Sequence, residues 1–179
     1  MTGPEKLLDP TGLDDRAADD TLAPRPPGLR GLTVGLLDNT KPNAVPLLRE
    51  IHAELRGRAG AGTSILYTKD YFGMPAADDL LKRIAGECDV VVTAVGDCGS
   101  CSAATVADGI LLERLGTPAV SVVSDSFLVS GGAMAKVQGF PGYAFAAARH
   151  PVASLDEKQI RERARAVMPE VLRILGVDS

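Results

Sequence analysis

The chain has 179 residues, and its composition is 45% hydrophobic, with 4% aromatic residues and no tryptophan. This length suits one domain with a substantial core and leaves no room for two large domains. The low aromatic content disfavours a surface that stacks nucleic-acid bases and suits an aliphatic α/β interior. A formal net charge of −4, without a block of Lys and Arg, also disfavours nucleic acid and anionic membranes as partners.

Membrane and secreted proteins are also disfavoured by the sequence. No apolar run approaches the roughly 20 residues that a transmembrane helix needs. The N-terminus carries acidic residues and prolines where a secretory signal would have an apolar segment. We therefore expect a cytoplasmic protein, in whose reducing environment three cysteines do not form a structural disulfide framework. Cys88 is then most simply a small packing residue.

Residues 1–30 are rich in proline and aspartate and show little apolar periodicity. Such a composition is typical of an extended or disordered segment. We expect a flexible arm or, alternatively, a segment that becomes ordered against a partner chain. Residues 31–179 are expected to form a single α/β domain.

Apolar runs and helical periodicities alternate along the rest of the chain. The runs that predict strands are residues 32–37, 64–68, 90–95, 119–123 and 143–147, of which 32–37 and 90–95 are expected to be buried. The stretches that predict helices are residues 44–58, 78–85, 103–115, 134–138 and 155–175. Strands and helices that alternate across short loops imply a mostly parallel sheet covered on both faces. We expect a flavodoxin-like, doubly wound three-layer sandwich with a mostly parallel five-stranded sheet.

A polar loop, residues 38–43, follows the first predicted strand. In open α/β sheets ligands bind at the carboxyl ends of the strands. Asp38, Asn39 and Lys41 are therefore candidate substrate-binding residues. The alternative is a structural turn in which Asn43 caps the following helix.

The third predicted strand breaks at Gly96 and runs into Asp-Cys-Gly-Ser-Cys-Ser, residues 97–102. A strand, a tight turn and a helix in this order place Cys98 and Cys101 at a helix N-terminus on the carboxyl edge of the sheet. Unpaired N–H groups and the helix dipole favour an anion there, either a thiolate or a substrate carboxylate. The pKa of a cysteine falls in such a position, so the turn predicts a nucleophilic thiol.

Three interpretations of the cysteine pair remain open at this point. A thioredoxin-type pair has the same spacing, which lets Cys101 attack a mixed disulfide formed on Cys98. A structural zinc site would need two further ligands, and Cys88, His52 and His150 lack zinc-ribbon spacing. The third interpretation is a pair of buried thiols in a glycine-rich turn.

Other polar residues near the turn are candidates for contact with a ligand. Gly99 and Ser100 give a small, open backbone that a substrate can approach closely. Asp97 and Ser102 are candidates for orienting a substrate or accepting a proton, and the alternative for Ser102 is a helix cap.

Two more candidates follow later strands. Asp125 comes directly after the fourth predicted strand and faces the ligand edge. His150 follows the fifth, and its ordinary pKa suits a general acid or base. The alternative for His150 is a hydrogen-bonded loop residue ahead of Pro151.

Gly-Asp-Cys-Gly-Ser-Cys-Ser, residues 96–102, resembles the motif of the UGSC family, in which selenocysteine or cysteine is followed by Gly-Ser-Cys. Cys98 occupies the selenocysteine position. The loop at 38–44, the Gly-Thr-Pro strand entry at 116–120 and the His-Pro pair at 150–151 also resemble family features. The resemblance covers roughly residues 32–175.

More distantly, the same order of features is similar to the selenoprotein B subunit of glycine, sarcosine and betaine reductases. In those enzymes selenium attacks a carbon next to a carboxylate and a C–N bond is cleaved reductively. The resemblance implies that Cys98 is the nucleophile and Cys101 the resolving thiol. Sulfur replaces selenium here, and this departure leaves the specific reaction open. Because those reductases are multi-subunit, the resemblance also implies an oligomer or a partner subunit.

The sequence thus predicts a thiol-dependent oxidoreductase or reductive lyase that acts on a small, carboxylate-bearing substrate. We expect no metal or bound cofactor, and we expect an external thiol or a thioredoxin-like protein as the reductant. One alternative is a redox-sensing or ligand-binding module without turnover. Another is a structural partner of a catalytic subunit.

Overall fold

The five predicted strands form one sheet in the computed structural model, which describes residues 20–177. The strands are β1 (Val34–Asp38), β2 (Ser64–Thr68), β3 (Val90–Gly96), β4 (Ala119–Ser124) and β5 (Ala146–Ala148). Their order is β2-β1-β3-β4-β5, and every neighbouring pair is parallel. This arrangement confirms the predicted flavodoxin-like fold.

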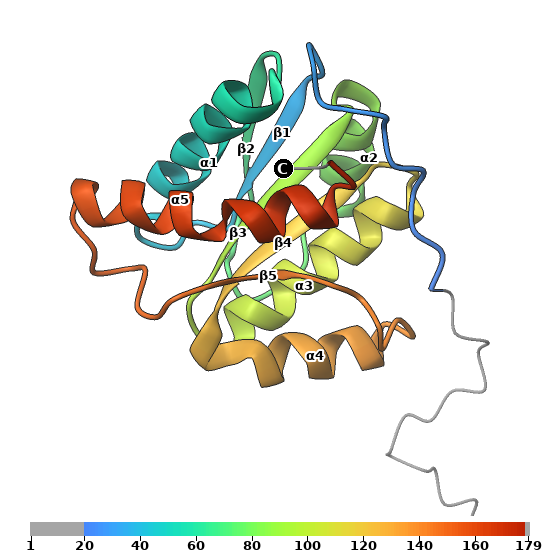
Figure 1. The fold of residues 1–179 in the computed structure, drawn as a ribbon. Helices are drawn as coiled ribbons and strands as arrows, with labels where there is room; N and C mark the ends of the chain where they lie inside the picture. The colour runs from blue at the N-terminus through green and yellow to red at the C-terminus, as the bar shows by residue number, and fades with distance from the viewer. Residues whose placement is uncertain (1–19, 178–179) are drawn as a thin grey trace, which may run out of the picture.

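Helices cover both faces of the sheet (Figure 1). They are α1 (Ala44–Ala59), α2 (Asp78–Glu87), α3 (Gly99–Arg114), α4 (Leu128–Val137) and α5 (Glu157–Ile174), with a short 3₁₀ helix, η1 (Asp125–Phe127), before α4. Helices α1 and α5 pack together on one face, and α2, α3 and α4 lie on the other. Within residues 20–177, no helix combines the length and apolar character that a membrane crossing requires.

The strand order reverses between β1 and β3, which are both buried along their whole length. From β1 the chain continues into α1 on one face, and from β3 it continues into α3 on the other. Ligands of open α/β sheets bind at such a switch point, outside the carboxyl ends of the strands. The loop after β1 and the cysteine turn after β3 are therefore neighbours at the position where the fold favours a site.

Two glycines let α3 lie directly on the sheet. A Cβ atom on Gly96 would be 2.6 Å from the Cα of Ser102 and 2.8 Å from Cγ1 of Val123. A Cβ atom on Gly109 would collide with the hydroxyl groups of Tyr143 and Ser121. Because any side chain at these positions would push α3 outward, the glycines fix the height of the cysteine turn above the sheet.

A buried ion pair fastens the loop after β2 to α3. The Nζ atom of Lys69 lies 2.6 Å from Oδ2 of Asp108, and both side chains are buried. The backbone N–H of Ala76 donates to the other carboxylate oxygen at 2.6 Å. Burial raises the pKa of Asp108 above its ordinary value, and the Lys69 ammonium opposes this shift. The loop at 69–77 is thus held at both ends beside α3.

Two element boundaries differ from the prediction for local reasons. Helix α3 begins at Gly99 rather than at residue 103, because the Cys98 side chain caps it by accepting a hydrogen bond from the Cys101 N–H. Strand β5 begins at residue 146 rather than 143, because Tyr143 packs in the core between α3, α4 and the sheet.

Helix α4 also begins earlier than predicted, at Leu128. Its glycine pair gives a weak helical signal in the sequence. In the structure Gly131 lies against Val106 and Phe145, since a Cβ there would be 3.1 Å from the first side chain and 3.0 Å from the second. Close packing therefore supports a helix that intrinsic propensity disfavours.

Residues 20–30 do not form the predicted flexible arm but pack on the domain. Ala23 is buried, and its N–H donates to Oε2 of Glu113 at 2.7 Å. The Arg25 guanidinium forms an ion pair with the same oxygen at 2.8 Å. A buried carboxylate needs such partners, and composition alone does not reveal them. Residues 1–19, the remainder of the predicted arm, lie outside the described part of the chain.

The seating of α3 predicts opposite effects for two Gly→Ala substitutions within helices. Gly109→Ala is expected to lower the free energy of unfolding by roughly 1–3 kcal/mol, because the new methyl group overpacks the contact with Ser121 and Tyr143. Gly132→Ala is the matched control; nothing lies within 4 Å of its Cβ position, so it is expected to raise stability by about 0.4–1 kcal/mol. Urea unfolding of both variants checks this, and equal stability of the two would contradict it.

Candidate functional site

The two cysteines of the turn differ in exposure. Cys98 and Cys101 form a disulfide at a Cα–Cα distance of 5.2 Å. Cys98 is half-buried, whereas Cys101 is fully buried. Cys98 is therefore the sulfur that a ligand or a second thiol can reach, and Cys101 is the sulfur beneath it.

Cys98 occupies the N-cap of α3, which agrees with the predicted position of the cysteine pair at a helix N-terminus but rules out Ser102 as the helix cap. Its Sγ atom accepts a hydrogen bond from the Cys101 N–H at 3.3 Å and lies 3.8 Å from the Ser100 hydroxyl. The first turn of α3 contains no acidic residue. A reduced Cys98 sulfur at this position would face an N–H group and the positive end of the helix dipole, which favour a thiolate over a thiol.

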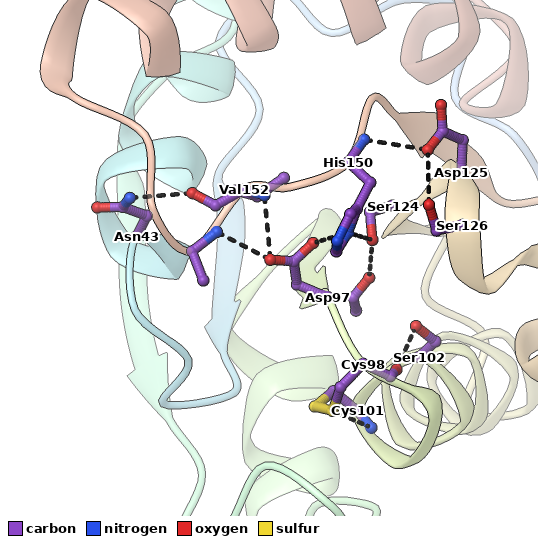
Figure 2. Close-up of polar contacts among 12 residues, drawn as sticks. Asn43, Asp97, Cys98, Cys101, Ser102, Ser124, Asp125, Ser126, His150 and Val152 are labelled. Atoms are coloured by element: carbon purple, nitrogen blue, oxygen red, sulfur yellow. Dashed lines mark hydrogen bonds and ion pairs between the residues drawn. A yellow bond between two sulfur atoms is a disulfide. The ribbon is translucent and has the colours of Figure 1, made fainter.

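The carboxylate of Asp97 points away from the disulfide, toward the segment that follows β5 (Figure 2). One oxygen, Oδ2, accepts hydrogen bonds from the N–H groups of Val152 at 3.0 Å and Ala153 at 2.8 Å. The other, Oδ1, lies 3.0 Å from Nδ1 of His150. Burial alone would raise the pKa of Asp97, but the Ala153 N–H, the Ser124 hydroxyl and the nearby groups stabilise the anion and lower the pKa overall.

Four neighbours hold His150. Its Nδ1 atom is 3.0 Å from Asp97 and 3.3 Å from the Ser124 hydroxyl. Its backbone N–H donates to Asp125 at 3.0 Å, and its ring makes a T-shaped contact with the Phe127 ring at a centroid distance of 5.4 Å. The side chain remains 37% exposed. Among the interactions of residues 20–177, none joins this ring to a cysteine sulfur, so the structure brings His150 to Asp97 rather than directly to Cys98.

Asn39 and Ser102 bind the protein itself. Asn39 is fully buried; its amide exchanges two hydrogen bonds with the Val95 backbone, at 3.0 and 2.7 Å, and donates to Thr105 at 3.2 Å. Ser102 is also fully buried and donates to the Cys98 carbonyl at 2.7 Å. These contacts argue against the predicted substrate-binding role for both residues, because their polar atoms are used in joining β1, β3 and α3.

Asp38 also has a local partner, because its carboxylate accepts the Thr40 N–H at 2.8 Å. Asn43 does not cap α1 as the alternative interpretation predicts. Its backbone is left-handed, with φ of 67°, and its side chain makes no cap hydrogen bond. The amide instead donates to the carbonyl groups of Val152 at 3.0 Å and Leu155 at 2.9 Å (Figure 2).

Lys41 lies beside the loop that approaches the cysteine turn. Its Nζ atom is 4.1 Å from the centre of the Phe72 ring, a cation–π contact. The next residue, Gly73, lies beside Ser100, since a Cβ on that glycine would be 3.6 Å from the Ser100 hydroxyl. The Lys41 ammonium group and the cysteine turn therefore both lie beside residues 72–73.

Helix α4 approaches the turn from another side. A Cβ on Gly99 would be 3.6 Å from the Ser130 hydroxyl. Tyr71 and Met74 on the loop after β2, and Val129 on α4, are exposed apolar side chains near these approaches. The turn thus lies between two segments that carry exposed apolar groups.

Within residues 20–177, no three His, Cys, Asp or Glu side chains come together in a way that could hold a metal ion. A surface pocket lies between α2 and α3, at the end of α3 opposite the cysteine turn. It is lined by Asp78, Leu81, Lys82, Leu111, Arg114 and Leu115.

The sequence model of the UGSC family matches residues 6–177, a span that includes the cysteine turn, the loop after β1 and His150. The chain belongs to the UGSC family. No curated protein and no solved structure matches it. Family membership therefore places this chain among UGSC proteins without assigning an activity.

Sequence reasoning missed three residues of this UGSC site. Ser124 and Phe127 contact the His150 ring, and Asn43 ties the loop after β1 to the segment after β5. Ser124 directly follows the predicted strand at 119–123, and this position was its one signal. The sequence also places Phe127 after this strand, at the ligand edge, but does not indicate its contact with a histidine.

The lowered pKa of Asp97 predicts an acid-dependent contribution to stability. The pKa of Asp97 in the folded protein lies below its ordinary value of 3.8. The ionised carboxylate therefore stabilises the fold above pH 3.8, and this stabilisation is lost as the pH falls through the pKa of the folded state. Asp97→Asn is expected to lower the free energy of unfolding by about 1–3 kcal/mol near neutral pH. The difference from wild type should shrink as the pH falls from about 5 toward about 2. Urea unfolding across this pH range checks it, and a pH-independent difference would contradict it.

Proposed function

We propose that this UGSC protein is a thiol-dependent enzyme whose Cys98 and Cys101 carry out nucleophilic redox chemistry on a small, carboxylate-bearing substrate. The observation that carries the proposal is the asymmetry of the pair. One sulfur is accessible at a helix N-terminus, and the other is buried and close enough to form a disulfide with it. This is the arrangement that an attacking thiol and a resolving thiol require.

The proposed reaction consists of two displacement steps. The Cys98 thiolate attacks an electrophilic carbon or heteroatom of a substrate R–X, forms an S–R bond and displaces X with its bonding electron pair. X takes a proton and leaves as HX. The Cys101 thiolate then attacks the Cys98 sulfur, and R leaves with the S–R electron pair and a proton as R–H. Two thiols and R–X thus give R–H, HX and one disulfide.

Lys41 and His150 supply the binding charge and the proton in this proposal. The ammonium of Lys41 and the N-terminus of α3 suit a substrate carboxylate. His150 is the candidate general acid for the departing group. Asp125 binds the His150 backbone and so supports the position of this segment.

Turnover requires an external reductant, for which we propose a small thiol or a thioredoxin-like dithiol protein in the cytoplasm. Such a reductant would attack the Cys98 sulfur, because Cys101 is buried. The exposed apolar groups beside the turn, Met74 and Val129 among them, suit contact with a protein. We further propose an oligomer or a partner subunit, by analogy with the multi-subunit reductases that the order of motifs resembles.

Alkylation of the reduced protein tests the nucleophile. In a Cys101→Ser variant, iodoacetate is expected to label Cys98 with a pH midpoint below the free-thiol value of about 8.5. Cys88 is an internal control, because burial raises the pKa of its thiol. Mass spectrometry of the labelled peptides, compared with a Cys98→Ser variant, gives the rates. Slow labelling with an ordinary midpoint would contradict the enzyme and favour a redox-sensing or ligand-binding module.

A matched pair of reagents tests the carboxylate preference. Iodoacetate carries a carboxylate, whereas iodoacetamide has a similar size and no charge. Lys41→Ala is expected to slow labelling of Cys98 by iodoacetate roughly fivefold, which corresponds to about 1 kcal/mol for a partly exposed charge. Labelling by iodoacetamide should stay within about twofold of the unsubstituted protein. An equal effect on both reagents would show that Lys41 does not recognise the carboxylate.

A further inference from the structure

We infer that Asp97 is a positioning residue that holds His150 in the tautomer protonated at Nδ1, so that Nε2 is the nitrogen that exchanges a proton with a ligand. The inference deepens the proposed function, in which His150 transfers the proton. It replaces the predicted substrate-binding role of Asp97, whose side chain is 3% exposed. The tautomer itself does not depend on what Cys98 does.

Asp97 accepts hydrogen bonds and has no hydrogen to donate. Its Oδ2 atom receives two backbone N–H groups, from Val152 and Ala153. These contacts, with the lowered pKa, describe an ionised carboxylate. An ionised carboxylate only accepts hydrogen bonds. The Nδ1 atom of His150, 3.0 Å from Oδ1, must therefore carry a hydrogen.

The other neighbour of His150 Nδ1 is the Ser124 hydroxyl, at 3.3 Å. A hydroxyl group has one hydrogen to donate. The Ser124 hydroxyl can donate its hydrogen to the Gly96 carbonyl oxygen at 3.1 Å or to the Asp97 carboxylate. The Ser124 oxygen consequently presents a lone pair to the ring. The Ser124 hydroxyl is therefore compatible with the tautomer that the Asp97 carboxylate requires.

The remaining ring nitrogen of His150 is Nε2. A neutral imidazole has one hydrogen, so Nε2 has the free lone pair. Within residues 20–177, the contacts of His150 use Nδ1, the backbone N–H and the ring edge, and none uses Nε2. Nε2 can then take a proton from a ligand and return it, while Nδ1 keeps its hydrogen bond to Asp97.

The second histidine of the chain provides an internal comparison. The Nε2 atom of His52 lies 3.1 Å from the Gly62 carbonyl, which only accepts hydrogen bonds. Neutral His52 must therefore be protonated at Nε2. The two histidines are expected to be opposite tautomers in one molecule.

The same hydrogen bonds specify the effect of Asp97→Asn. The N–H groups of Val152 and Ala153 still need an acceptor, so the amide oxygen takes the place of Oδ2. The amide NH₂ then faces Nδ1 of His150 and donates to it. His150 must accept through Nδ1, and its hydrogen moves to Nε2. Ser124→Ala removes the second acceptor and leaves Asp97 in place, so it should not change the tautomer.

Two-bond ¹⁵N–¹H correlation spectra of the ¹⁵N-labelled full chain test the inference, because they distinguish protonated from unprotonated ring nitrogens. Spectra are taken about two pH units above the ordinary histidine pKa of about 6.5. We expect the Nδ1–H form for His150 and the Nε2–H form for His52 in the wild type. Asp97→Asn should switch His150 alone, and Ser124→Ala should switch neither. Unchanged His52 signals report that each variant is folded.

The Nε2–H form of His150 in the wild type would overturn the inference, whether or not the variants fold. An unswitched His150 in folded Asp97→Asn would also overturn it. Failure of the proposed function gives a different result, since Cys98 would then label slowly while His150 kept the expected tautomer.

Discussion

The buried carboxylate of Asp97 fixes the geometry of the site. A buried charge costs several kcal/mol unless hydrogen bonds and opposite charges compensate it. Asp97 obtains this compensation from Ser124 at the end of β4 and from His150, Val152 and Ala153 after β5. The carboxylate therefore draws three segments, far apart in the sequence, to one point beside the cysteine turn. Any other path for residues 150–153 would leave the carboxylate with Ser124 alone among these partners.

A second constraint is the polar character of the layer beneath α3. Asn39 joins β1 to Val95 and Thr105, and Asp108 pairs with Lys69. An aliphatic contact tolerates small sliding, whereas hydrogen bonds between buried groups are directional and costly to leave unmade. These contacts give α3 one position along the sheet. Because Cys98 caps α3, they also set the position of its sulfur.

The fold could be predicted because each strand is an apolar run between loops, and alternation with helices restricts the connections. Residues 64–68 were predicted as a strand with the bounds that β2 has. The cysteine turn was placed by the same reasoning. The environment of Asn39 was not predictable in this way, because a polar residue at a strand end has the same sequence pattern whether it faces a ligand or the core. The pairs Lys69–Asp108 and Arg25–Glu113 join segments distant in sequence, and periodicity carries no information about them.

In the proposed mechanism, the group that carries electrons is separate from the group that carries protons. The sulfur atoms belong to α3, and the imidazole belongs to the segment after β5. Asp97 is the one residue that is adjacent to Cys98 in the chain and also in contact with the His150 ring. Its carboxylate contacts go to Ser124, His150, Val152 and Ala153, and none of these partners is a sulfur. In the disulfide state described here the ring is already held by acceptors on Nδ1. Because breaking the disulfide removes none of these contacts, the imidazole should keep the same orientation when Cys98 is reduced.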